Sequence, residues 1–248
     1  MHATFLGTNG WYASKTGGTV CTLIESRNKN IVLDAGGGIA KLEKFANLEK
    51  PTFVFLSHLH LDHVEGLHVI SKFRFRKPLR IFCPKPYVGK LGNLLNRPYT
   101  LAPHEFAFPA KIIGMPQGSA QIGGFRATCK KLEHSDPCFG YRLEIEGKTI
   151  AYCPDTGICK NVYELAENAD LLICEAAYLP GEAHAGWPHL NPESAAEIAA
   201  KSGAKKLVIT HFDASRYTSL KQRKSAQTVA RKIFPKTLSA FDGMGIEI

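Results

Sequence analysis

Four side chains that can bind a metal ion lie within six consecutive residues of this sequence: His58, His60, Asp62 and His63. They follow directly after the apolar run Thr52–Leu56, which predicts a β-strand. In an extended segment alternate side chains share a face, so His58 and His60 are expected to point the same way from the strand end. Asp62 and His63 lie where the chain turns into a predicted helix. Two pairs of ligands on the two sides of a strand-to-helix corner suit two adjacent metal ions better than one.

Polar side chains also end four other apolar runs of the sequence. These runs are typical of strands with turn signals between them, and the residues at their ends are His134, Asp155, Glu175 and His211. Neighbouring strand ends converge in layered α/β folds, so these side chains can belong to the same site. Asp34 ends a further predicted strand, and we interpret it as a structural residue that accepts hydrogen bonds from backbone amides.

The order of the predicted elements is β-rich and then βα, twice over. Predicted strands include residues 2–6, 19–25, 30–33, 52–56, 79–83, 149–153, 171–174 and 207–210, and predicted helices cover about 39–47, 64–73, 192–202 and 219–233. This order predicts an α/β fold in which two sheets pack face to face with helices outside. The chain has 248 residues and no linker rich in Pro, Gly or Ser. Residues 1–248 are therefore predicted to form a single domain.

Two features of the sequence bear on where the protein works. The N-terminus lacks the pattern of a secretory signal, and we find no apolar run near the length of a membrane span, so a cytoplasmic location without membrane contact is expected. The seven cysteines are odd in number, are widely spaced and contain no C-x-x-C pair. We interpret them as buried, reduced thiols rather than as a disulfide framework.

Positive charge is concentrated near the C-terminus. The formal net charge is +9, and the stretch from Arg216 to Lys236 holds seven basic residues and no acidic one. Such a field favours an anionic partner, either a phosphate ester or a nucleic acid. The alternative is that this stretch is the solvated face of a helix. Charge alone does not choose between them.

The order of the ligand residues resembles the ligand series of the metallo-β-lactamase superfamily. The series in this chain is His58-x-His60-x-Asp62-His63, then His134, Asp155 and His211. The resemblance covers nearly the whole chain and implies the four-layer αββα sandwich of that superfamily. Within it, Glu175-Ala-Ala, His189-Leu-Asn and Ile-Thr-His211-Phe resemble motifs of the ribonuclease Z branch.

The resemblance also implies how two divalent metal ions would be held. One would be bound by His58, His60, His134 and Asp155. The other would be bound by Asp62, His63, Asp155 and His211, so that Asp155 bridges the two ions with a hydroxide between them. Imidazole and carboxylate ligands suit zinc, which is the first choice, although manganese or iron could occupy the same ligands.

Hydrolysis of a phosphodiester is the chemistry that the resemblance favours. In the ribonuclease Z branch the residue that matches His189 contacts the scissile phosphate or the leaving group. The residue that matches Glu175 orients that histidine. These two residues and Asp62, as a proton acceptor beside the metal, are the predicted catalytic groups. Relatives of this branch often pair as homodimers, but the sequence leaves the oligomeric state of this chain open.

The sequence departs from ribonuclease Z in two places. Only 21 positions separate His134 from Asp155, which leaves no room for the long arm that holds tRNA in the bacterial enzymes. The loop 7–15 also lacks the Pro-x-Lys-x-Arg-Asn pattern of that branch. Both departures favour a small or cyclic phosphodiester over tRNA. The alternatives are an RNA 3′-processing endonuclease, a non-catalytic RNA-binding module stabilised by metal, and a thioester or lactone hydrolase.

Overall fold

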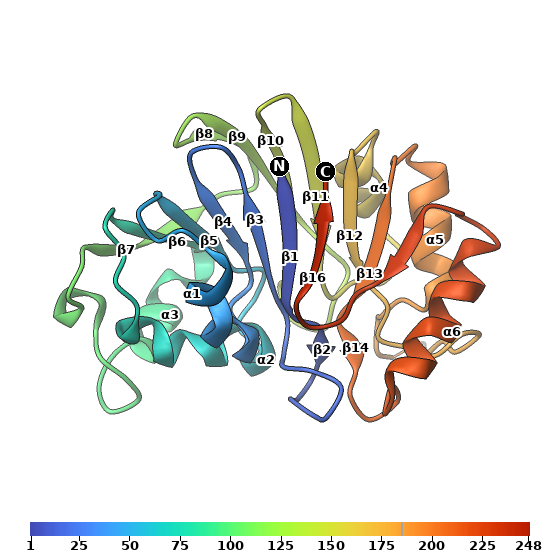
Figure 1. Ribbon diagram of the computed structural model, residues 1–248, viewed down its shortest axis with the longest axis horizontal. Helices are drawn as coiled ribbons and strands as arrows, with labels where there is room; N and C mark the ends of the chain where they lie inside the picture. The colour runs from blue at the N-terminus through green and yellow to red at the C-terminus, as the bar shows by residue number, and fades with distance from the viewer. Residues whose placement is uncertain (185) are drawn as a thin grey trace.

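The computed structural model describes residues 1–184 and 186–248, and two seven-stranded sheets dominate it (Figure 1). The first sheet has, in spatial order, β16 (Met244–Glu247), β1 (His2–Gly7), β3 (Cys21–Glu25), β4 (Asn30–Leu33), β5 (Thr52–Phe55), β6 (Leu79–Pro84) and β7 (Ala110–Met115). The second has β15 (Thr237–Ser239), β13 (Leu207–Thr210), β12 (Leu171–Glu175), β11 (Lys148–Cys153), β10 (Phe139–Ile145), β9 (Phe125–Lys131) and β8 (Gly118–Ile122). A two-stranded parallel ladder joins β2 (Asn9–Gly10) to β14 (Phe212–Asp213).

Helices cover the outer faces of both sheets, as Figure 1 shows. The first sheet is covered by α1 (Leu42–Phe45), α2 (Leu61–Val64), α3 (Val88–Leu94) and the 3₁₀ segments η1 (Gly37–Lys41), η2 (Glu65–Lys72) and η3 (Lys85–Tyr87); η4 (Pro103–Glu105) lies in the loop before β7. The second sheet is covered by α4 (Lys160–Ala166), α5 (Pro192–Lys201) and α6 (Leu220–Arg231). The order of layers is αββα, so the predicted fold class is confirmed.

The two sheets meet in a shared core that is built from alternate side chains of their strands. Phe55 of the first sheet lies at its centre, where its ring stacks on Phe82 with centroids 4.9 Å apart and meets Phe125 and Tyr141 of the second sheet edge to face. One further core lies between each sheet and the helices that cover it. Burial on both faces explains why the strands appear in the sequence as continuous apolar runs.

The parallel strands place the candidate ligands at one edge of the sandwich. Strands β4 to β7 are parallel in the first sheet, and β11, β12, β13 and β15 are parallel in the second. The carboxyl ends of β5, β11, β12 and β13 lead into His58, Asp155, Glu175 and His211. Because parallel strands end at the same edge, residues far apart in the chain meet there.

Several predicted elements differ from the observed ones. The helix predicted over 64–73 is a short α2 followed by 3₁₀ turns, and the helix predicted over 39–47 ends at Phe45 after a 3₁₀ start. Close packing explains the tighter turns, since a Cβ on Gly66 would lie 2.2 Å from the carbonyl oxygen of Gly36. Helix α4 and strands β15 and β16 were not predicted, because short segments show too little periodicity.

Helix α5 agrees closely with its predicted bounds. It begins after Asn191, whose side chain accepts a hydrogen bond from the amide of Ser194, and Pro192 occupies the first turn.

All seven cysteines are unpaired. Among the described residues, no helix combines the length and apolar character needed to cross a membrane.

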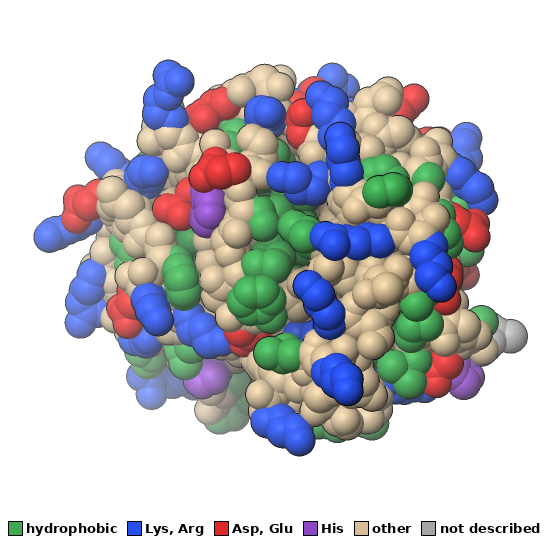
Figure 2. All heavy atoms as spheres, turned by 45° about the vertical axis from the view of Figure 1, so that its right-hand side comes forward, with side chains coloured by type: hydrophobic (Ala, Val, Ile, Leu, Met, Phe, Trp, Pro, Cys, Tyr) green, Lys and Arg blue, Asp and Glu red, His purple; other side chains and the backbone are tan. Residues whose placement is uncertain are grey.

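The basic stretch from Arg216 to Lys236 is only partly a solvated helix face. In Figure 2 the molecule is turned so that the right-hand side of Figure 1 comes forward. Lys and Arg side chains gather at the centre of this face, with few acidic side chains among them. Arg223 of α6, in contrast, is buried. Its guanidinium donates hydrogen bonds to Thr8 Oγ1 at 2.7 Å, Thr16 Oγ1 at 3.1 Å and Asn9 Oδ1. This buried cation therefore ties α6 to the loop that leads into Trp11.

Replacing Arg223 tests this structural role. We expect Arg223→Met to lower the free energy of unfolding by about 3 kcal/mol, because three buried acceptors lose their donor. Urea denaturation measures the change. Lys224→Met on the exposed side of the same helix is the matched control and should stay within about 0.5 kcal/mol of the parent. Equal effects of the two substitutions would contradict the role.

Candidate metal centre

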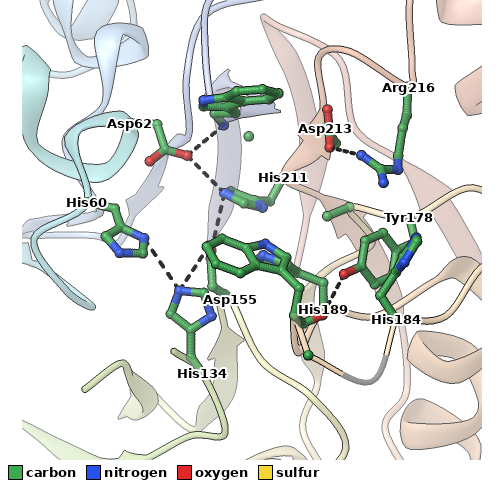
Figure 3. A pocket seen from close by; sticks show the side chains of 15 residues that line it. His60, Asp62, His134, Asp155, Tyr178, His184, His189, His211, Asp213 and Arg216 are labelled. Carbon is green, nitrogen blue, oxygen red and sulfur yellow. Dashed lines mark hydrogen bonds and ion pairs between the residues drawn. The ribbon is translucent and has the colours of Figure 1, made fainter. Parts of the chain in front are cut away.

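The structure brings all seven predicted metal ligands together in two adjacent groups. In each group every residue offers one ligand atom within 4.8 Å of the others: His58, His60, His134 and Asp155 form the first, and Asp62, His63 and His211 form the second. His58 and His60 lie in the loop after β5, while Asp62 and His63 lie in α2. The two sides of the strand-to-helix corner thus contribute to different groups. Figure 3 shows His60, Asp62, His134, Asp155 and His211 converging on one space.

Asp155 lies between the two groups and turns one carboxylate oxygen to each. Its Oδ1 is 3.0 Å from Nε2 of His63 and 3.2 Å from Nε2 of His211. Its Oδ2 is 3.9 Å from Nε2 of both His58 and His134. Asp155 therefore faces both groups of candidate ligands.

Several of these atoms are buried without a hydrogen bond, which tests whether the residues fit metal ions. In the described part of the chain, the buried polar atoms that make no hydrogen bond include Nε2 of His58, Nδ1 of His134, Oδ1 of Asp155 and Nδ1 of His211. A buried polar atom without a partner costs about 1–3 kcal/mol. Nε2 of His58 faces Asp155 within the cluster, where a cation would satisfy it. The donor set, imidazole nitrogens with carboxylate oxygens, is one that zinc and related divalent ions accept.

The pKa values of two histidines in the first group also suit a cation. Burial lowers the pKa of His58 and of His134, which keeps both imidazoles in the neutral form that binds metal. Burial by itself would raise the pKa of Asp155, but the neighbouring His211 and His63 outweigh it and hold that pKa well below its ordinary value. The Asp155 carboxylate is therefore ionised.

Asp34 contacts the ring of His63 on the side opposite the cluster. Its Oδ2 is 2.7 Å from Nδ1 of His63 and accepts hydrogen bonds from the hydroxyls of Ser57 at 2.8 Å and Tyr152 at 2.6 Å, while Oδ1 accepts from the Ser57 amide at 2.7 Å. The backbone contact agrees with the structural role predicted for Asp34. The contact with His63 was missed, although a carboxylate at the end of β4, beside β5, was a signal for it. A partner on Nδ1 leaves Nε2 to face the cluster.

Asp136 contacts His60 in a similar way and was also missed. Its Oδ2 is 3.0 Å from Nε2 of His60, so Nδ1 of His60 points toward His134 at 3.4 Å from its Nε2. Asp136 lies two residues after His134 in the short loop between β9 and β10. An exposed acidic residue in a loop carries no sequence signal of this contact.

The backbone is held in unusual conformations around the cluster. Among the described residues, five outside glycine have positive φ, and three of them belong to this site: Trp11 at 71°, Asp34 at 55° and His211 at 53°. Residues other than glycine rarely adopt this backbone conformation, and those that do tend to occur at functional sites. The amide of Trp11 donates to Oδ2 of Asp62 at 2.7 Å. Gly10 packs against the ring of His211, and a Cβ there would lie 2.6 Å from it.

His189 and Glu175, predicted as a catalytic pair, are in contact beside the cluster. Nδ1 of His189 is 2.7 Å from Oε1 of Glu175, which also accepts the amide of Thr156 at 2.7 Å. Burial would lower the pKa of His189, but the Glu175 carboxylate and its hydrogen bond raise it to about 9. The ligand-type atoms of His189, Asp155 and His211 lie within 4.8 Å of one another.

A comparison with protein families covers the residues of this site. A model described as a beta-lactamase superfamily domain matches residues 29–212 of the chain. The chain belongs to the β-lactamase superfamily. The match contains every candidate metal ligand, from His58 to His211.

Relatives within the β-lactamase superfamily match the chain over nearly all of its length. Ribonuclease BN of Proteus mirabilis is 28% identical over 98% of this chain and 98% of its own. Among solved structures, the metallo-beta-lactamase fold protein YhfI of Bacillus subtilis has a TM-score of 0.83 at 24% identity and covers 100% of this chain and 98% of its own. Human tRNase Z, short form, has a TM-score of 0.80 at 25% identity, covering 100% and 99%.

Membership of the β-lactamase superfamily confirms the predicted enzyme class. The chain is a metal-dependent hydrolase, and the superfamily fold implies that its His and Asp cluster binds divalent metal ions. The cluster opens into a cavity of about 570 Å³. His60, Asp62, His134, Asp155, His189 and His211 line it, which gives a substrate access to both groups.

The contact between Asp34 and His63 predicts an effect on metal binding. We expect Asp34→Asn to weaken affinity for divalent metal by about 10- to 100-fold, since the imidazole loses the carboxylate that orients it. Competition with a chelator measures the affinity. Glu49→Gln, at an exposed ion pair with Arg76, is the control and should leave it unchanged. Unchanged affinity in a correctly folded Asp34→Asn variant would show that Asp34 supports only the backbone.

Proposed function

We propose that this hydrolase is a dinuclear phosphodiesterase for small or cyclic phosphodiesters, with His58, His60, Asp62, His63, His134, Asp155 and His211 as metal ligands. The observation that carries the proposal is the position of Asp155, which turns one oxygen to each ligand group. Two bound divalent ions, with zinc as the first choice, would supply a water of lowered pKa and would bind the oxygens of the diester. No carboxylate other than Asp155 joins both groups of candidate ligands among the described residues.

The chain's own residues then position the substrate. His189 lines the cavity and is held through Nδ1 by the buried Glu175, so its other ring nitrogen is available to a phosphate or leaving-group oxygen. Asp62 accepts the amide of Trp11 and lies 3.2 Å from Nε2 of His211. We propose Asp62 as a proton acceptor at the cluster, and its contact with His211 supports that role.

The short connection from His134 to Asp155 supports a small substrate. In the described structure this segment contains only β10 and β11, which pair as an antiparallel hairpin. The alignment with ribonuclease BN runs over 306 positions, whereas this chain has 248 residues, so the relative carries segments that have no counterpart here. A cavity of about 570 Å³ is of the size that encloses one small ligand.

The second candidate is an RNA 3′-processing endonuclease. The names of the relatives, ribonuclease BN and tRNase Z, favour it, as does the basic C-terminal stretch. Two basic residues of that stretch are engaged within the protein, however. Arg223 is buried, and Arg216 donates to Glu182 and Asp213. The stretch therefore offers less charge to RNA than its sequence indicates.

A panel of substrates tests the function directly. Purified protein with its metal content determined by elemental analysis should hold about two metal ions per chain and should hydrolyse 2′,3′- and 3′,5′-cyclic nucleotides. Precursor tRNA, a thioester and a lactone complete the panel. Cleavage of precursor tRNA without turnover of any small diester would favour the endonuclease. Turnover of only the thioester or lactone, or a single metal ion in active protein, would overturn the proposal.

The pair of His189 and Glu175 gives a separate prediction. We expect His189→Asn to lower kcat for a small diester by about 100-fold or more, because a group that contacts the reacting oxygens is lost. Metal content should not change. His68→Asn, an exposed histidine in η2, is the control for removing an imidazole. A variant at His189 with full kcat would remove it from the proposed site.

A further inference from the structure

Both tryptophans of the chain line the catalytic cavity. Trp11 and Trp187 are the two tryptophans in the sequence, and both are among the lining residues. Trp11 is 68% exposed and Trp187 is 51% exposed. A tryptophan usually buries most of its large apolar surface, so two exposed ones beside a single cavity indicate surface kept for a ligand.

Trp187 lies close to the reacting end of the cavity. Its ring centroid is 6.3 Å from that of His134 and 6.1 Å from that of His189. The backbone oxygen of Trp187 accepts a hydrogen bond from the hydroxyl of the buried Tyr178, whose own backbone oxygen accepts from Tyr217 at 2.7 Å. The backbone of Trp187 is thus anchored to the buried loop after β12, and its indole lies beside the rings of His134 and His189.

The cavity beyond Trp187 is aromatic and carries little free charge. Tyr178, His184 and Arg216 line it, and Figure 3 shows them on the side away from His60 and Asp62. The Arg216 guanidinium lies 5.2 Å above the ring of Tyr178 and is paired with two carboxylates, Glu182 at 3.0 Å and Asp213. Because these acids neutralise the arginine, this end does not favour a second phosphate. A planar, uncharged group suits it better.

We propose that this end of the cavity is a nucleobase subsite, in which the base of a nucleoside phosphodiester stacks on Trp187. The proposal rests on the proposed diesterase function for the position of the phosphate and adds the chemical class of the organic group. Every nucleobase offers a flat π-face, so stacking selects nucleosides over aliphatic diesters without choosing one base. An aliphatic diester of equal charge would bind the same ligand groups but would leave the indole exposed.

A change in substrate preference tests the subsite. The measured quantity is kcat/KM for a 2′,3′-cyclic nucleotide divided by kcat/KM for glycerol 1,2-cyclic phosphate, which has no base. We expect Trp187→Ala to lower this ratio about 10- to 100-fold through loss of one stacked ring. Trp187→Phe should restore most of it. Tyr99→Ala, an exposed aromatic residue outside this cavity, should leave the ratio unchanged.

Fluorescence gives a readout that needs no turnover. In Trp11→Phe the indole of Trp187 is the sole tryptophan. A nucleoside 5′-monophosphate should quench its emission in a saturable way, whereas ribose 5-phosphate, which carries the phosphate without a base, should not. Equal quenching by both ligands, or a preference ratio that Trp187→Ala leaves unchanged, would overturn the subsite.

The two experiments separate failure of the subsite from failure of the proposed function. If cyclic nucleotides and glycerol cyclic phosphate are both hydrolysed with the same ratio in the parent and in Trp187→Ala, the diesterase stands and the subsite is wrong. If no diester is hydrolysed but nucleoside monophosphates still quench Trp187 selectively, the nucleobase subsite stands and the reaction assigned to the cavity is wrong.

Discussion

The site depends on one buried carboxylate that faces two groups of imidazoles. Asp155 lies 3.0 to 3.9 Å from the ring nitrogens of His58, His63, His134 and His211. In the low dielectric of the protein interior, each of these groups would be costly to bury alone. Together they lower the pKa of Asp155 and keep it ionised. The ionised state of Asp155 therefore depends on its neighbours, because a carboxylate with neither imidazoles nor cations around it could not remain charged there.

The fold meets this constraint by rigid support from both sheets. Asp34 and Ser57 come from the first sheet and its following loop, and Tyr152 comes from the second sheet, yet the three share one set of hydrogen bonds behind His63. The stacked rings of Phe55 and Phe82 lie in the core just before that loop begins. Side chains fixed on strand ends keep their geometry better than side chains on long loops. Strained backbone at Asp34 and His211 can persist because the surrounding structure holds it.

The two ends of the cavity have different physical character. One end has buried imidazole nitrogen atoms without hydrogen bonds, which suit cations. The other end has rings and a neutralised arginine that suit an uncharged planar group. The exposed Trp187 connects the two ends.

The types and order of the candidate ligands and the two-sheet architecture are already evident in the sequence. Closely spaced ligands such as His58 and His60 are recognisable because local periodicity and strand-end position decide their direction, and long apolar runs decide the buried strands. The 3₁₀ character of η2, strands β15 and β16, and the contacts of Asp34 with His63 and of Asp136 with His60 were decided by tertiary structure. Each joins segments distant in the chain, or depends on packing as tight as that of Gly66 on Gly36. Contacts between distant segments leave no periodic signal, since only the folded strand order brings them together.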